Sequence, residues 1–350
     1  MVDIFNFENN IIPILNEKID RNGYVKYGDD NRYPIFLYDL YNDCAEHQSI
    51  VDGITNYVLG SGMISDNPNL NLFLNKVNKD NENINDILMK CILDYIIFGG
   101  FSIQVIPNRQ KELVELYWVD FMNCRISEDE KLVYYSKDWD KKWGNNRFEV
   151  FNNFNGEFNG KSQIYYFKGY KTRGVYPSPL YNGAIRSIMT SIEIDKFHLN
   201  NISNGFQAST IISFNNGEPT IEQKKEIEKK INEKFSGTSG QKLMTIFNES
   251  KEKGVEIQKM NADDFGEQFQ ELDKNTRNNI FTAHKVTSPA LFGVIVENQG
   301  FSKTEFNESF EIFNNTIIKS YQNIFIKEFS KLFNNFYNDF ELKIKPFELN

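Results

Sequence analysis

A short proline-rich segment, Tyr-Pro-Ser-Pro at 176–179, divides the chain into two parts with different sequence patterns. Each proline fixes its own backbone and restricts the residue before it, so this segment is extended and cannot continue a helix. Before it, helical patterns alternate with short stretches of β-branched and aromatic residues, and after it long amphipathic helical patterns dominate. The chain is therefore expected to adopt an α+β fold with a mixed first part followed by long helices.

Two helices and four strands are expected before this segment. Apolar residues near helical spacing predict one helix over 34–59, ended by Gly60 and Gly62, and another over 85–98, ended by two glycines. Partial alternation of β-branched and aromatic residues predicts an antiparallel sheet. Its expected strands lie at 101–105, 113–118, 131–135 and 163–167.

Three long helices are expected after the segment, with a small insert between the first and the second. Apolar residues at helical spacing predict the first helix over 180–204 and the second over 263–285. The insert should contain a helix that opens with the capping-box pair Thr220 and Gln223. Its expected strands lie near 210–214, 242–247 and 255–259. An insert of roughly sixty residues is small for a domain that folds alone.

A loop is expected between the second and third long helices. Residues 287–302 contain Pro289, Gly293 and Gly300, which makes the segment too irregular to continue a helix. After this loop, large apolar residues at helical intervals predict the third helix, as far as Phe336. A connection between packed helices usually needs only about two to eight residues, so a loop of this length calls for a functional explanation.

Composition limits the class of protein. With 40% hydrophobic and 15% aromatic residues, the chain can bury a large core, so a disordered or collagenous protein is excluded. It contains no apolar run of about eighteen residues and no signal-peptide pattern, so a soluble protein is expected. The odd number of cysteines, Cys44, Cys91 and Cys124, favours reduced thiols in the core. The net charge of -9 is unlike that of a protein that grips DNA through a broad basic face.

Several local motifs accompany this order of elements. They are Gly-Asp-Asp-Asn-Arg-Tyr-Pro at 28–34, Tyr-Pro-Ser-Pro-Leu at 176–180, Asn-Gly at 204–205 and the segment from His284 to Gly293. In motifs and in order, the chain resembles the tailed-bacteriophage portal family, the head-tail connectors. In that family the elements form a wing, a first stem helix, a clip, a second stem helix, a tunnel loop and a long helix that returns to the wing.

The resemblance implies a portal-type fold with a mixed α/β wing, long stem helices, a small α/β clip and a tunnel loop. The implied parts are a wing over 1–178, a first stem helix over 179–205, a clip over 206–262, a second stem helix over 263–286, a tunnel loop over 287–302 and a returning helix with the C-terminal end over 303–350. A crown after this helix is expected to be absent or vestigial.

The resemblance also implies a structural function. Portal subunits form a ring, typically a dodecamer, at the unique capsid vertex of the virion, and double-stranded DNA is packaged and ejected through it. The implied partners are the terminase large subunit, the major capsid and scaffold proteins, tail connector proteins and DNA bound without sequence specificity, with no membrane. The ring would assemble in the host cytoplasm. No enzymatic activity, cofactor or metal is expected.

Three sets of residues are expected to carry this function. The DNA-facing tunnel loop would present Val294, Glu297, Asn298, Gln299 and Gly300. The clip would dock the motor and the connectors through Lys225, Lys229 and Lys230. The first stem helix would start at Pro177, Ser178 and Pro179. Because glutamates interleave the clip lysines, a solvated helix face is the alternative interpretation of that cluster.

Two other functions stay open from the sequence. A phage-encoded metal-dependent nuclease would place Asp263 and Asp264 at its metal site. Two adjacent acids at a helix start more often interact with the helix dipole, which disfavours the nuclease. A structural adaptor that forms no DNA channel is the third possibility.

The cysteine and histidine residues form no recognisable metal-binding or nucleophile motif in the sequence. Cys44 and His47 have the spacing of half a zinc site but lack a second pair, so two residues near the core are the favoured interpretation. His198 and His284 lie on predicted helices without a nucleophile motif nearby, and they are interpreted as packing or surface residues.

Overall fold

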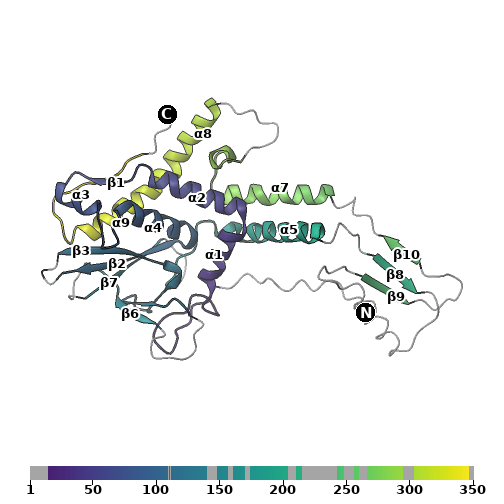
Figure 1. Ribbon diagram of the computed structural model, residues 1–350, viewed down its shortest axis with the longest axis horizontal. Helices are drawn as coiled ribbons and strands as arrows, with labels where there is room; N and C mark the ends of the chain where they lie inside the picture. Colours follow the sequence, from purple (N-terminus) through teal and green to yellow (C-terminus); the bar gives the residue numbers. More distant parts are fainter. Residues whose placement is uncertain are drawn as a thin grey trace. The chain divides into compact units, whose positions relative to one another are not determined.

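The computed structural model shows a protein of two compact units (Figure 1). It describes residues 15–108, 110, 112–139, 148–156, 161–169, 174–203, 210–214, 243–247, 256–259, 266–294 and 303–346. Unit 1 consists of Met1–Arg186 and Ile280–Asn350, and unit 2 consists of Ser187–Asn279. Among the described residues, no helix combines the length and the hydropathy needed to cross a membrane.

The first helical region of unit 1 is two helices and not the single helix expected over 34–59. Helix α1 spans Tyr33–Asp43 and helix α2 spans Ala45–Leu59, and the backbone of Cys44 between them is extended. Asn42 and Asp43, just before the break, are residues whose side chains compete for backbone hydrogen bonds and favour helix ends. The break places the side chain of Cys44 in the core, where it is fully buried.

Helix α4, Ile84–Phe98, confirms the second predicted helix. Asn83 caps its start in a capping box with Asp86, and Gly99 ends it with a left-handed backbone at φ 86°. Between α2 and α4 lie strand β1 (Met63–Ser65) and helix α3 (Pro68–Leu74), which the sequence patterns did not predict.

The four predicted strands belong to two sheets, so the expectation of one sheet was wrong. Antiparallel strands β2 (Gly100–Pro107), β3 (Leu113–Val119) and β7 (Gln163–Lys168) pair in the order β3-β2-β7. Strand β5 (Leu132–Tyr135) pairs instead with β4 (Cys124–Ile126) and β6 (Glu149–Asn152). A 3-10 turn, Phe121–Asn123, redirects the chain between β3 and β4, because Phe121 is buried against the rings of Phe98 and Tyr166.

The predicted third long helix consists of three consecutive segments. They are α8 (Lys303–Phe313), the π-helical turn η5 (Asn314–Ile318) and α9 (Lys319–Phe333). Phe325 and Phe329 of α9 stack on Phe101 of β2, which packs this helix on the sheet. The chain then returns as strand β11 (Leu342–Ile344), which pairs with β1.

Unit 2 contains most of two long helices and a three-stranded sheet. The first long helix is α5, Ile185–Ser203, and the second is α7, Gly266–Ala283. Strands β8 (Thr210–Phe214), β9 (Leu243–Phe247) and β10 (Glu256–Lys259) confirm the three strands expected in the insert. β8 lies between the others, antiparallel to β10 and parallel to β9. The predicted helix at Thr220 and Gln223 lies outside the described residues.

Candidate functional site

The segment that follows α7, as far as Val294, forms a turn packed on α2. Helix α7 ends where Lys285 adopts a positive φ of 56°, and Val286 N–H closes the turn on the carbonyl of Phe281 at 3.0 Å. Pro289–Phe292 then forms the 3-10 turn η4, which ends at Gly293 with φ 75°. The first half of the predicted loop over 287–302 is therefore ordered helical turn, since Pro289 fixes its start.

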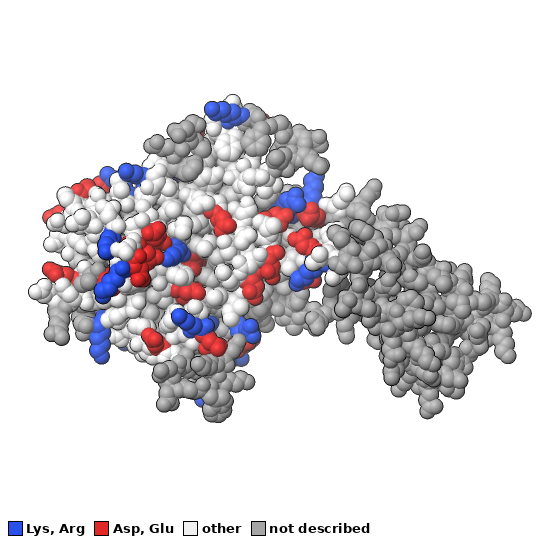
Figure 2. Space-filling view, in the orientation of Figure 1, with Lys and Arg blue, Asp and Glu red and all other residues white. Residues whose placement is uncertain are grey.

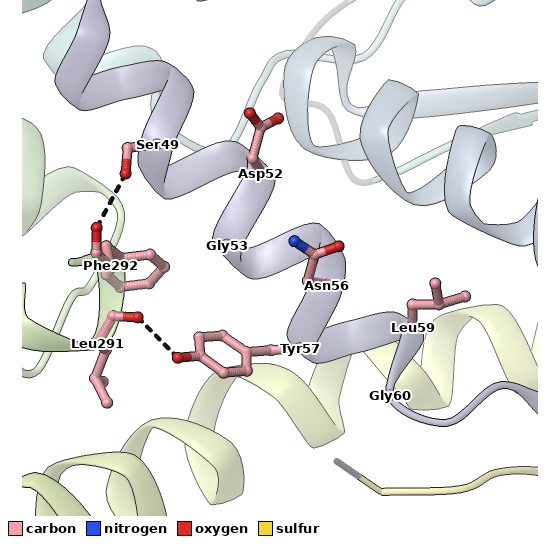
Figure 3. A pocket seen from close by; sticks show the side chains of 9 residues that line it. All are labelled: Ser49, Asp52, Gly53, Asn56, Tyr57, Leu59, Gly60, Leu291 and Phe292. Carbon is pink, nitrogen blue, oxygen red and sulfur yellow. Dashed lines mark hydrogen bonds between the residues drawn. The ribbon is translucent and has the colours of Figure 1, made fainter.

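Two hydroxyl groups of α2 hold η4 in place. Ser49 Oγ donates to the carbonyl of Phe292 at 3.1 Å, and the hydroxyl of Tyr57 donates to the carbonyl of Leu291 at 2.7 Å (Figure 3). These bonds satisfy carbonyls at the end of a short helix, which have no partner within the helix itself. The end of η4 is thus fixed to α2 immediately before Val294.

Gly53 allows the closest contact between α2 and η4. A Cβ atom at Gly53 would lie 2.5 Å from a ring carbon of Phe292, closer than any real side chain tolerates. The ring of Phe292 also meets Phe313, with centroids 5.6 Å apart and nearly perpendicular planes. A glycine inside a helix is usually unfavourable, so its presence in α2 was the one sequence signal that could have indicated this contact.

An open groove of about 640 Å³ runs beside this contact. Its lining consists of Ser49, Asp52, Gly53, Asn56, Tyr57, Leu59, Gly60, Leu291 and Phe292, which Figure 3 shows on one side of α2 and on the turn facing it. The lining mixes carboxylate, amide and hydroxyl groups with apolar surface. It contains no nucleophile and base pair that could carry out catalysis.

A buried histidine pair joins the end of α7 to the start of α2. His47 Nδ1 and His284 Nε2 are 2.9 Å apart, so one of the two nitrogens carries the hydrogen and donates a hydrogen bond to the other. The ring of Tyr181 packs against both, with centroids 4.3 Å from His47 and 5.3 Å from His284. His47 Nε2 is buried and has no hydrogen-bond partner among the described residues.

Burial keeps this pair neutral. It lowers the pKa of His284 to about 4, and it lowers the pKa of His47 well below its ordinary value, with a further contribution from His284. A charged imidazolium would lose its hydration in this apolar site, which is why the neutral form is favoured. The interpretation of His284 as a packing residue is confirmed, and its partnership with His47 was missed.

The predicted start of the first stem helix is held by tyrosines. The hydroxyl of Tyr27 donates to the carbonyl of Pro177 at 3.1 Å, and the ring of Tyr27 stacks on that of Tyr176 with centroids 3.9 Å apart. Asn182 N–H donates to the carbonyl of Pro179 at 3.1 Å, which begins a short 3-10 turn before α5.

Ser178 lies close to the end of α4. A Cβ atom at Gly99 would come within 2.8 Å of the carbonyl oxygen of Ser178, so the left-handed glycine that ends α4 also makes room for this segment. The hydroxyl of Tyr181 adds a bond to the carbonyl of Ile97 at 2.9 Å. The proline segment therefore rests on α4 and does not extend freely into solvent.

A fully buried arginine supports the tyrosine stack. Arg125 donates to the side chain of Asn31 at 2.6 Å and to its carbonyl at 2.7 Å. It also donates to the carbonyls of Met122 at 2.9 Å and Cys124 at 2.7 Å. Asn31 has a positive φ of 65°, and its side-chain oxygen accepts from Tyr27 N–H at 3.0 Å. The motif over 28–34 thus positions Tyr27, and through it the proline segment that precedes α5.

Several predicted site residues lie outside the described residues. They are Glu297, Asn298, Gln299, Gly300, Lys225, Lys229, Lys230, Asp263 and Asp264. Val294 is described: it is half-buried and its N–H donates to the carbonyl of Pro289 at 3.2 Å. Of the predicted site residues, the structure therefore places Val294 beside α2 through η4, and it places Pro177, Ser178 and Pro179 against Tyr27 and α4.

The cysteines are placed as expected. Cys44, Cys91 and Cys124 are free and buried. Cys44 Sγ donates to Glu46 at 3.7 Å, while His47 faces His284, so the two residues of the possible half zinc site point to different partners. Within the described residues, no group of three or more histidine, cysteine, aspartate or glutamate side chains could hold a metal ion.

Comparison with known proteins gives one family and one fold. A family model described as phage portal protein matches residues 56–346, which include the end of α2, His284 and the turn η4. A search of the curated proteins found no match.

Solved structures with the same fold include parts of gene transfer agent (GTA) particles and a phage portal protein. The neck of an empty GTA particle, computed with C6 symmetry, is similar with a TM-score of 0.60 and 13% identity, over 89% of this chain and 84% of that chain. The neck of a native GTA particle, computed with C12 symmetry, gives 0.59 and 14%, over 94% and 85%. An HK97 family phage portal protein from Corynebacterium diphtheriae gives 0.51 and 10%, over 95% and 96%. At these identities the similarity concerns the fold.

Proposed function

The chain belongs to the phage portal protein family, and on that basis we propose that it is one subunit of a ring through which double-stranded DNA enters and leaves a capsid. The family is structural, and the fold is of the portal type. The match over 56–346 is the observation that carries the proposal, because it spans the helices and the loop that would surround the DNA.

The ring itself is supported by the symmetry of the similar structures. The two GTA necks were computed with C6 and C12 symmetry. A closed ring of identical subunits needs head-to-tail contacts whose rotation completes a circle. We propose the same arrangement here, with a dodecamer as the expected stoichiometry.

The segment after η4 would form the DNA-facing constriction. The described chain is fixed to α2 as far as Val294, so the contacts of Ser49, Gly53 and Tyr57 would act as the base of a tunnel loop. The polar residues Glu297, Asn298 and Gln299 would then meet DNA without a fixed cation that traps phosphate. The contacts of Ser49 and Tyr57 would thus set the point from which the loop begins.

The charge of the protein is consistent with weak binding of DNA. The net charge is -9, and the face in Figure 2 carries both signs without a continuous basic surface among the described residues. A strongly cationic channel would hold the DNA backbone and slow its passage. The clip would dock the terminase large subunit and later the tail connectors, and capsid and scaffold proteins would surround the wing.

Imaging of the purified full chain tests the proposal. Negative-stain electron microscopy and native mass spectrometry should show closed rings of about ten to fourteen subunits with an axial hole, the range that small changes in subunit rotation allow. Only monomers or dimers over a wide concentration range, with scaffold and capsid proteins supplied, would contradict it. A complementary packaging assay should show that procapsids without this protein fail to take up DNA.

A further inference from the structure

The exposed side of α1 and α2 is acidic. Residues 33–59 contain four acids and no lysine or arginine. Asp39, Asp43 and Asp52 are exposed, and Glu46 is half-buried. Arg32, directly before α1, is the nearest cation in the sequence. We call the side of α1 and α2 that carries Asp39, Asp43 and Asp52 the acidic face.

The carboxylates of Asp39 and Asp43 on this face repel one another. The pKa of Asp39 is raised, first by partial burial and then by the neighbouring charge of Asp43, while Arg32 opposes the shift. A carboxylate whose pKa is raised in this way is stabilised by any further cation brought close to it. The acidic face therefore favours a cationic partner from outside these two helices.

An aromatic pair lies on α1. Tyr38 is 40% exposed, and its ring centroid is 6.1 Å from that of Tyr41. The hydroxyl of Tyr41 donates to Asp52 at 2.6 Å, which joins the aromatic pair to the acids. Exposed tyrosines are frequent anchors of protein interfaces, because a rigid ring buries much area at little entropic cost.

The exposed side of α9 has the opposite charge. Lys319, Lys327 and Lys331 are exposed and lie at intervals of four or eight residues, so they share one side of the helix. The one acid in this helix, Glu328, is buried and accepts from Lys331 at 2.8 Å and from Tyr165 at 2.6 Å. We call this side of α9 the lysine face.

None of the three lysines forms an ion pair with an exposed acid among the described residues. Lys319 donates to the side-chain oxygen of Asn315 at 2.6 Å, and Lys327 makes no ion pair with any residue that the structure describes. Their long aliphatic stems can cover apolar surface while the ammonium groups reach a carboxylate. The lysine face is thus suited to a partner that combines aromatic rings with acids.

Both faces belong to unit 1. Helix α2 packs against both α1 and α9. Figure 1 draws α1 and α9 near different ends of α2, and among the described residues no ion pair joins Asp39, Asp43 or Asp52 to a lysine of α9. This arrangement suits a contact between copies better than a contact within one subunit.

We propose that the lysine face of α9 in one subunit docks on the acidic face of α1 and α2 in the next copy of the chain. The proposal rests on the ring proposed above, because a head-to-tail ring requires two different and complementary faces on every subunit. Lys319 and Lys327 would approach Asp39 and Asp43, and Tyr38 would be buried between the helices. Complementary charge would also guide the subunits into register and speed their association.

Two charge-reversed variants test this pairing. The first is Asp39→Lys with Asp43→Lys, and the second is Lys319→Glu with Lys327→Glu. Each alone should need about tenfold more protein for half-maximal ring assembly at low salt, because like charges then meet at every contact. An equimolar mixture should assemble again, since alternating subunits pair opposite charges at both kinds of contact.

The control variant is Lys131→Glu with Lys137→Glu, two exposed lysines that belong to none of the helices α1, α2 and α9, and it should assemble like the unmodified protein. Circular dichroism verifies that every variant is folded. Normal assembly of both charge-reversed variants, or folded variants whose mixture fails to assemble, would overturn the pairing. Failure of the unmodified protein to form rings would instead overturn the proposed function, so the two failures are distinguishable.

Discussion

His47 Nδ1 lies 2.9 Å from His284 Nε2, although 237 residues separate the two in sequence. His47 is in the first turn of α2, and His284 directly follows the second long helix α7. Tyr181, just before α5, packs on both rings. The cluster therefore joins the ends of both long helices to the helix that anchors the predicted tunnel loop.

We expect unit 1 to lose stability on acidification between about pH 6.5 and pH 4. The folded pKa of His284 is about 4, below its ordinary value of 6.5, so the unfolded chain binds more protons in this window. The free energy of unfolding should fall by about 1.4 kcal/mol for each pH unit below 6.5. This decrease should stop below the folded pKa of His284. Urea denaturation between pH 4 and pH 8 measures it. A His284→Gln variant should show a shallower slope.

Gly53→Ala should destabilise the anchor of the loop. The new methyl group would lie 2.5 Å from the ring of Phe292, and overpacking of this kind costs about 1 to 3 kcal/mol. Thermal denaturation and hydrogen exchange of the amides of Leu291 and Gly293 would report it. Gly183→Ala is the matched control, because no atom lies within 4 Å of a Cβ there. Equal stability of both variants would contradict the close contact.

Arg125→Met should destabilise unit 1 by about 2 to 4 kcal/mol, since it leaves several buried carbonyl and amide oxygens without donors. Arg125→Lys should recover only part of this loss, because an ammonium group cannot reproduce the planar fork that binds Asn31 and Met122 together. Hydrogen exchange at Tyr176 should rise in both variants. The exposed Arg21, replaced by methionine, serves as the control and should change stability by less than about 0.5 kcal/mol.

Shortening the loop from Val294 to Gly300 to a brief Gly-Ser link should impair DNA packaging or retention but leave ring assembly intact. The reason is that the anchor residues on α2 and η4 stay in place, while the segment proposed to face the DNA is lost. Particle counts and genome length after packaging provide the measurement. A variant that packages and retains full-length DNA would show that another element contacts the DNA.

Charge reversal at Lys229 and Lys230 should weaken binding of the terminase motor more than ring formation. Removal of a rim charge mainly slows association and changes its salt dependence. Surface plasmon resonance with the purified motor, beside native mass spectrometry of the ring, separates the two effects. Normal motor binding together with failed ring assembly would assign this face to the contact between subunits.

The sequence predicted the helices and the strands better than their pairing. The strands at 210–214, 242–247 and 255–259 and the helix ending at Phe98 follow directly from apolar periodicity and from glycine caps. The break at Cys44 was missed because apolar spacing continues across it, and the decisive contribution is the burial of that side chain. The division into two sheets was missed because local alternation identifies a strand but not its neighbour.

What the sequence by itself determined is the order of elements and, through that order and its motifs, the portal family. Apolar periodicity, prolines and capping residues determine the backbone conformation of only a few neighbouring residues, so their effects can be recognised in the sequence. Only the tertiary structure decided that Gly53 receives the ring of Phe292, that Ser49 and Tyr57 hold η4, and that His47 meets His284. These contacts join residues more than 230 positions apart. They depend on shape complementarity between packed elements, which no local pattern contains.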